Sequence, residues 1–279
     1  MGVHQETDYS SFTFIDVVVD DDGIAVATLN RPDKLNAADR VGHGEFAKSL
    51  RAFAADDRVK VVVLRAAGKA FSVGGSWDYE EELSSDRNSQ WRVHREARDL
   101  VYAHLELDKP VITALQGYAF GSGTAYALLA DFVIVERHVK FGDGHVFGGM
   151  PAGDGGVLIW PLSIGMIRAK KYLLTGDVID AVEAERIGLV TEVVETGESF
   201  DRAMALARRL AAGPQRAMRY TKRALNQQLR QAALTSFDMS LSLELESMYF
   251  GDEFAEYLRV ASSGEGLIDR SWQWRPPPA

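Results

Sequence analysis

The apolar residues in the first half of the chain alternate between segments with strand-like and helix-like patterns. The turn Asp20-Asp21-Asp22-Gly23 separates two apolar segments and predicts a β-hairpin. Continuous apolar runs are typical of strands buried on both faces, whereas apolar residues every three or four positions predict helices. The predicted strands are 12–19, 24–29, 59–64, 111–115 and 132–135, and the predicted helices are 38–55, 87–107 and 121–129. This order favours an α/β core with a mostly parallel sheet over residues 1–200.

The second half of the chain has a mainly helical pattern. Helices are predicted over 169–174, 182–187, 200–211, 215–231 and 237–250, with one more strand at 189–194. Gly213-Pro214 ends one helix and begins the next. We expect residues 201–279 to form a C-terminal helical region of the same continuous domain, which either completes the core or packs against another subunit. The final residues, 275–279, are expected to be frayed.

Composition and charge exclude several classes of protein. Of the 279 residues, 46% are hydrophobic and 25% charged, which is ordinary for a globular protein. The net charge of -9 makes nucleic acid an unsuitable partner, because phosphate binding needs a basic surface. With no cysteine, disulfides and thiolate chemistry are excluded. We see neither a signal peptide nor an apolar stretch long enough to span a membrane, and we therefore expect a cytoplasmic protein.

Two glycine-rich turns carry the strongest chemical signal. Residues 71–77 and 116–123 each follow a predicted strand, and the second also precedes a short helix. Backbone N–H groups in the first turn of a helix have no internal partner and favour an anionic oxygen. A single turn of this kind is more often only a tight turn. Neither turn has the pattern of a nucleotide-binding loop.

Taken in order, five segments resemble the crotonase (enoyl-CoA hydratase/isomerase) superfamily. They are Leu29-Asn30-Arg31-Pro32-Asp33-Lys34-Leu35-Asn36-Ala37, Lys69-Ala70-Phe71-Ser72-Val73-Gly74-Gly75, the run 109–123, Ala152-Gly153-Asp154-Gly155-Gly156 and Leu173-Leu174-Thr175-Gly176. The resemblance implies a crotonase/ClpP-like spiral of ββα units followed by helices that form homotrimers, often paired as hexamers. It also implies an acyl-CoA substrate, with coenzyme A as part of the substrate and no separate cofactor.

The same resemblance implies where a substrate would bind. The N–H groups of Gly75 and Ser122 would form an oxyanion hole for the thioester carbonyl. The first signature would place Arg31 and Lys34 near the coenzyme A phosphates. The main chain of Phe71, Ser72, Val73 and Gly74 would lie beside the adenine. Trp77 is expected to line the acyl pocket, and Gly121 and Asp143 are further candidates for substrate contact.

The sequence departs from the hydratase pattern at both catalytic glutamates. The first position is Ala125 and the second is His145, and alanine cannot transfer a proton. An imidazole with its ordinary pKa is suited to acid–base work at neutral pH. We therefore expect His145 to act as general base, with Asp154 on its other ring nitrogen fixing the tautomer. The alternatives are that His145 is a structural histidine and that Asp154 caps the helix beginning near Gly155.

A histidine and an aspartate at these positions also resemble the β-diketone hydrolase branch, to which 6-oxocamphor hydrolase belongs. That branch completes its site with a glutamate late in the chain, and the match is Glu246. The chain differs from the branch in having Ser122 where the branch has a histidine. Three functions follow: an acyl-CoA lyase or isomerase, a hydrolase of C–C bonds in a β-diketone or β-keto acyl-CoA, or a non-catalytic acyl-CoA-binding protein. We see no spacing typical of metal ligands.

Overall fold

The structure is a computed structural model that describes residues 7–263, so the predicted frayed end and the last part of the C-terminal region lie outside the described residues. Ten strands form two sheets among these residues. The strands are β1 (Ile15–Val19), β2 (Ile24–Leu29), β3 (Val61–Ala66), β4 (Ala70–Ser72), β5 (Val111–Leu115), β6 (Tyr118–Phe120), β7 (Phe132–Glu136), β8 (Lys140–Gly142), β9 (Ile179–Asp180) and β10 (Glu192–Val194).

The helices lie between and after these strands. The front half contains η1 (Pro32–Lys34), α1 (Arg40–Ala55), α2 (Trp77–Ser85), α3 (Arg87–Glu106), α4 (Ser122–Leu128) and η2 (His145–Gly148). The back half contains α5 (Gly156–Ile164), α6 (Met166–Thr175), α7 (Ala181–Ile187), α8 (Ser199–Ala211), α9 (Gln215–Ala232), the π-helix η3 (Ala233–Phe237), α10 (Asp238–Phe250) and α11 (Asp252–Ser263).

The larger sheet has the order β1-β2-β3-β5-β7-β10. The hairpin pairs β1 with β2 in antiparallel fashion, and the other neighbours are parallel. Both faces are covered: α8 packs against one face through Ala203 and Ala207, and the main apolar core lies on the other. Burial on both faces explains why β3 and β5 are continuous apolar runs. The predicted hairpin and parallel α/β core are confirmed.

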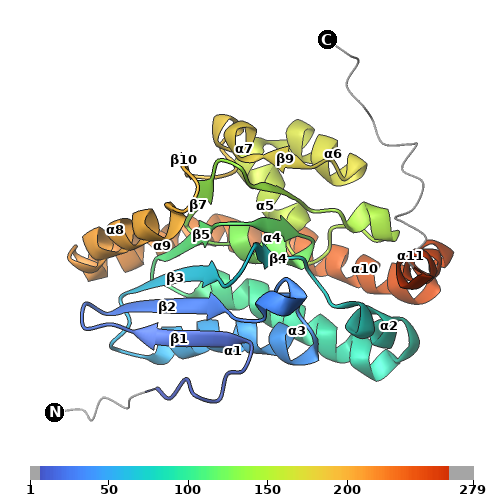
Figure 1. The fold of residues 1–279 in the computed structure, drawn as a ribbon, viewed down its shortest axis with the longest axis horizontal. Helices are drawn as coiled ribbons and strands as arrows, with labels where there is room; N and C mark the ends of the chain where they lie inside the picture. Colours follow the sequence, from blue (N-terminus) through green and yellow to red (C-terminus); the bar gives the residue numbers. More distant parts are fainter. Residues whose placement is uncertain (1–6, 264–279) are drawn as a thin grey trace.

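The smaller sheet has the order β4-β6-β8-β9, and its first three strands are parallel. Each of these three strands follows directly after a strand of the larger sheet, so that β3–β4, β5–β6 and β7–β8 are successive pairs, each followed by a helix. Figure 1 shows these repeats rising through the molecule from β3 to β7. The expected spiral of ββα units is therefore confirmed.

The repeated ββα units bring three loops to one edge of the smaller sheet. Because β4, β6 and β8 are parallel neighbours, the three loops that follow them leave the same edge of the sheet. On this side α2, α10 and α11 pack against one another, and α11 also contacts η2 (Figure 1). Among the described residues no helix is both long and apolar enough to cross a membrane.

Candidate active site

The two glycine-rich turns lie side by side at this edge. The backbone N–H of Ala38 donates to the Gly74 carbonyl at 2.8 Å, and the Gly121 N–H donates to the Asp143 carbonyl at 2.8 Å. A Cβ added to Gly74 would lie 3.7 Å from the Ser122 nitrogen, so the first turn touches the start of α4. The structure therefore brings the loops after β4, β6 and β8 together, although they are about 50 and 20 residues apart in the chain.

Gly121 positions the second turn. It has φ 53° and ψ −131°, which a residue with a side chain rarely adopts. Gly121 is the N-cap residue of α4, and no side chain caps this helix. Within the part of the chain that the structure describes, the N–H groups of Gly75 and Ser122 donate no hydrogen bond to another backbone group outside helices and strands. Both residues line one cavity of about 490 Å³.

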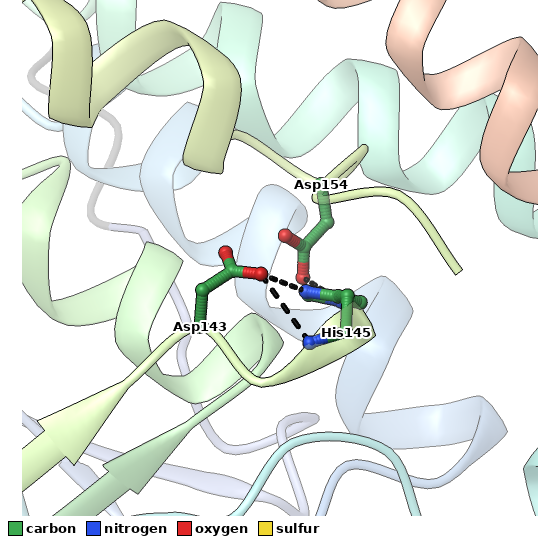
Figure 2. A group of neighbouring side chains, drawn as sticks. All are labelled: Asp143, His145 and Asp154. Atoms are coloured by element: carbon green, nitrogen blue, oxygen red, sulfur yellow. Dashed lines mark hydrogen bonds and ion pairs between the residues drawn. The ribbon is translucent and has the colours of Figure 1, made fainter. Parts of the chain in front are cut away.

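His145 lies at the base of this cavity between two carboxylates (Figure 2). Its Nδ1 is 2.7 Å from Oδ1 of Asp143, and its Nε2 is 3.5 Å from Oδ2 of Asp154. The imidazole is only 8% exposed. The structure brings together the predicted His145 and Asp154, and it adds Asp143, which contacts Nδ1 while Asp154 faces Nε2.

The two carboxylates determine the charge of the imidazole. Burial lowers the pKa of His145, but the charges of Asp154 and Asp143 outweigh burial and raise that pKa well above its ordinary value. The two carboxylates therefore favour the protonated form of the imidazole.

Asp154 does not cap α5. Gly155 is the N-cap residue of that helix, and no side chain caps it. Both carboxylate oxygens of Asp154 are buried and lack a hydrogen-bond partner in the described part of the protein. Apart from its ion pair with Nε2 of His145, this carboxylate is therefore available to a bound ligand.

Two further carboxylates face the cavity. Oε1 of Glu244 lies 3.8 Å from Nε2 of His145, and burial raises the pKa of Glu244. Glu80, from α2, also lines the cavity, and burial raises its pKa to about 7, although the charge of His145 opposes the rise. The predicted late glutamate, Glu246, is exposed and does not line the cavity. The prediction of Glu246 is therefore wrong, and Glu244 occupies the place expected for it.

The remaining predicted contacts divide between two adjoining cavities. Val73, Gly74, Gly121 and Asp143 line the first cavity. Arg31 and Lys34 line a second cavity of about 670 Å³, where the Arg31 guanidinium forms an ion pair with Asp39. The two cavities share the wall residues Val73, Gly75, Tyr79, Glu80 and Tyr257.

One predicted contact residue lies elsewhere than expected. Trp77 is half exposed in the second cavity and packs against Tyr257, with 5.4 Å between ring centroids, so it does not line the first cavity. Phe71 is fully buried in the core, and the Ser72 hydroxyl donates to the Asn36 carbonyl at 2.8 Å. The expected contact of their main chain with the adenine stays a prediction.

Asp143, His145 and Asp154 each offer a possible metal-ligand atom, and these atoms lie within 4.8 Å of one another. The two ring nitrogens point in opposite directions, however, and each already faces its own carboxylate. The arrangement is better suited to holding and moving a proton.

Comparison with known proteins identifies the family of this chain. Residues 20–257 match the family model described as enoyl-CoA hydratase/isomerase. The crotonyl-CoA hydratase of Syntrophomonas wolfei is 33% identical over 234 residues, 83% of this chain and 86% of that protein. The 1,2-epoxyphenylacetyl-CoA isomerase of Escherichia coli is 31% identical, over 86% of this chain and 91% of that protein.

Among solved structures, an enoyl-CoA hydratase/isomerase from Mycobacterium paratuberculosis superposes with a TM-score of 0.85 at 36% identity. The match covers 88% of this chain and 98% of that one. The fold and the edge-of-sheet cavity thus define an enzyme of the crotonase superfamily. Within it, the chain belongs to the enoyl-CoA hydratase/isomerase family.

Proposed function

We propose that this protein transfers protons next to the carbonyl of an acyl-CoA thioester, as in enoyl-CoA hydration or isomerisation. The observation that carries the proposal is the meeting of three loops at one cavity. Two of these loops supply the Gly75 and Ser122 amides, and the third supplies His145. A carbonyl that accepts hydrogen bonds from both amides gains stabilisation as it becomes an enolate, typically ~10²–10³-fold in rate per donor.

His145 is the proton carrier in this proposal. Asp143 holds Nδ1, and Nε2 is directed toward Asp154 and Glu244 at the cavity. In hydration, the oxygen of water bonds to Cβ of the enoyl group while the π electrons move to the carbonyl oxygen. The enolate then takes a proton at Cα from the imidazolium, which leaves a neutral imidazole to be protonated again.

Coenzyme A would occupy the second cavity. Lys34 and Arg31 lie there, and the shared wall at Gly75 would let the thioester cross from one cavity to the other. Exposed apolar side chains on the C-terminal helices, such as Leu225, Leu234 and Met239, support assembly into a homotrimer or a hexamer of two trimers. Light scattering of the purified protein tests the assembly.

A second candidate function is the hydrolysis of a C–C bond in a β-diketone or a β-keto acyl-CoA. The position of Glu244 beside His145 and Asp154 favours it, because a late glutamate completes the site of the hydrolase branch that this sequence partly resembles. In this reaction water attacks a carbonyl, and the carbanion leaves as an enolate.

Mass spectrometry of products from a panel of enoyl-CoA, β-keto acyl-CoA and cyclic diketone substrates separates the candidates. Addition of water with an intact carbon skeleton supports hydration, whereas a cleaved C–C bond with a new carboxylate supports hydrolysis. His145→Gln should lower turnover by at least ~10²-fold, the usual contribution of a general acid or base. If the variant matched the wild type on every substrate turned over, a non-catalytic acyl-CoA-binding role would replace both candidates.

A further inference from the structure

Glu80 has a buried carboxyl group, and none of the five family motifs includes this residue. It lies on α2, just after the first glycine-rich turn. A Cβ added to Gly75 would lie 2.8 Å from Oε1 of Glu80, so the carboxyl group rests against the proposed oxyanion donor. Its other oxygen, Oε2, is buried and has no hydrogen-bond partner among the residues described.

Glu80 lies in the wall that the two cavities share. A thioester with its acyl group in the first cavity and coenzyme A in the second must have its reacting atoms at the shared wall. Of the residues that form this wall, Glu80 is the one with a carboxylate. Asp154 and Glu244 instead flank Nε2 of His145 and act with it as one unit.

We propose that Glu80 is a second catalytic residue, which accepts the proton of the attacking water in the hydration proposed above. It would supply the carboxylate that the family pattern places at Ala125 and this chain lacks. This inference rests on the proposed function.

Glu80 and His145 together account for both protons that move during hydration. Water forms its bond to Cβ and gives one proton to the Glu80 carboxylate, and the imidazolium of His145 gives one proton to Cα. The product has gained one water molecule, and Glu80 is neutral beside a neutral His145. Transfer of one proton from Glu80 to His145, directly or through solvent, restores the starting state.

The surroundings of Glu80 suit a group that gains and loses a proton near neutral pH. The titratable groups that line the same cavity from other elements are His43, Asp143, His145, Asp154, Glu244 and Tyr257. Burial raises the pKa of Glu80 to about 7, and the charge of His145 limits the rise. The carboxyl group is thus neither permanently charged nor permanently neutral in the physiological range.

The test compares Glu80→Gln with Glu81→Gln, a matched variant of the exposed neighbour on the same helix. With crotonyl-CoA as the substrate, Glu80→Gln should lower kcat by about 10²-fold with little change in KM, and it should remove the acidic limb of the kcat/KM profile near pH 7. Glu81→Gln should match the wild type. Circular dichroism confirms that each variant is folded.

A second readout separates the two proton carriers. Exchange of the α-protons of butyryl-CoA in D2O, followed by mass spectrometry, needs His145 but not Glu80. Glu80→Gln should therefore keep this exchange and lose hydration, while His145→Gln should lose both. Hydration by Glu80→Gln within threefold of wild type, an unchanged pH profile, or a rise in KM alone would overturn the role of Glu80. Absence of both hydration and exchange in the wild type would overturn the proposed function itself.

Discussion

The buried carboxyl of Glu80 predicts a stability that falls as the pH rises. Burial raises its pKa from 4.5 to about 7, so the folded protein keeps a proton that the unfolded chain releases between these values. The unfolded chain binds fewer protons in this window, and the slope of the unfolding free energy against pH is therefore negative. The contribution of Glu80 is favourable at low pH and is lost as pH rises through the folded pKa.

The rise in the pKa of Glu80 determines how much folding free energy is lost as the pH increases. One pKa unit corresponds to about 1.4 kcal/mol, so a site titrating at about 7 instead of 4.5 loses roughly 2–3 kcal/mol of folding free energy between pH 5 and pH 8. Glu80→Gln keeps the size of the side chain and removes the titration. Relative to wild type, the variant should therefore gain this amount of stability on going from pH 5 to pH 8.

Urea denaturation of wild type and Glu80→Gln at pH 5, 6, 7 and 8 measures the difference, with protein concentration held constant because the chain is expected to form oligomers. Glu81→Gln is the control and should show a difference that does not vary with pH, since Glu81 is exposed. A Glu80→Gln difference that stays constant within about 0.5 kcal/mol would refute the reasoning, because the carboxyl would then titrate alike in the folded and unfolded states.

Three other variants test the rest of the cluster. Asp143→Asn removes a charge that raises the pKa of His145, so that pKa should fall in an NMR titration, and an unchanged pKa would show that Asp143 does not stabilise the protonated imidazole. Glu244→Gln should lower kcat by at least about tenfold while Glu246→Gln stays near wild type, and equal effects in steady-state assays would contradict the assignment of Glu244. Gly153→Ala places a Cβ 2.1 Å from Oε2 of Glu244 and should destabilise the fold by about 1–3 kcal/mol in urea denaturation, whereas a neutral effect would mean that α10 is free to move.

The sequence predicted the larger sheet better than the smaller one. Strands such as β3 and β5 are long enough for a continuous apolar run to be visible. By contrast, β4, β6 and β8 have three residues each, which is too few for any periodicity. The loops of the site follow these short strands. The family motifs include β4 and β6, whereas β8 lies outside them.

The helical spacing of buried residues on α10 distinguishes Glu244 from Glu246. On α10 the buried positions include Leu241, Glu244 and Met248, which recur every three or four residues. Glu246 is two residues beyond Glu244, and two residues turn a helix by about 200°, so their side chains point in nearly opposite directions. Attention to the buried stripe would have selected Glu244.

Glu80 and Asp143 depend on contacts that no pattern in the chain reveals. Glu80 is one of three successive glutamates, a run that resembles a solvated helix start, yet it faces the cavity while Glu81 faces solvent. Asp143 is two residues from His145 and resembles a turn former, yet it accepts the hydrogen bond from Nδ1. Local sequence does not distinguish these roles, because the tertiary packing of the loops decides them.

The account depends above all on two amides that converge on one substrate oxygen. A crystal structure of the protein with an unreactive acyl-CoA analogue tests this most directly. We expect the carbonyl oxygen about 3 Å from the nitrogens of both Gly75 and Ser122, with the acyl chain beside His145. A carbonyl oxygen held by only one of the two amides, or bound away from both, would contradict the account.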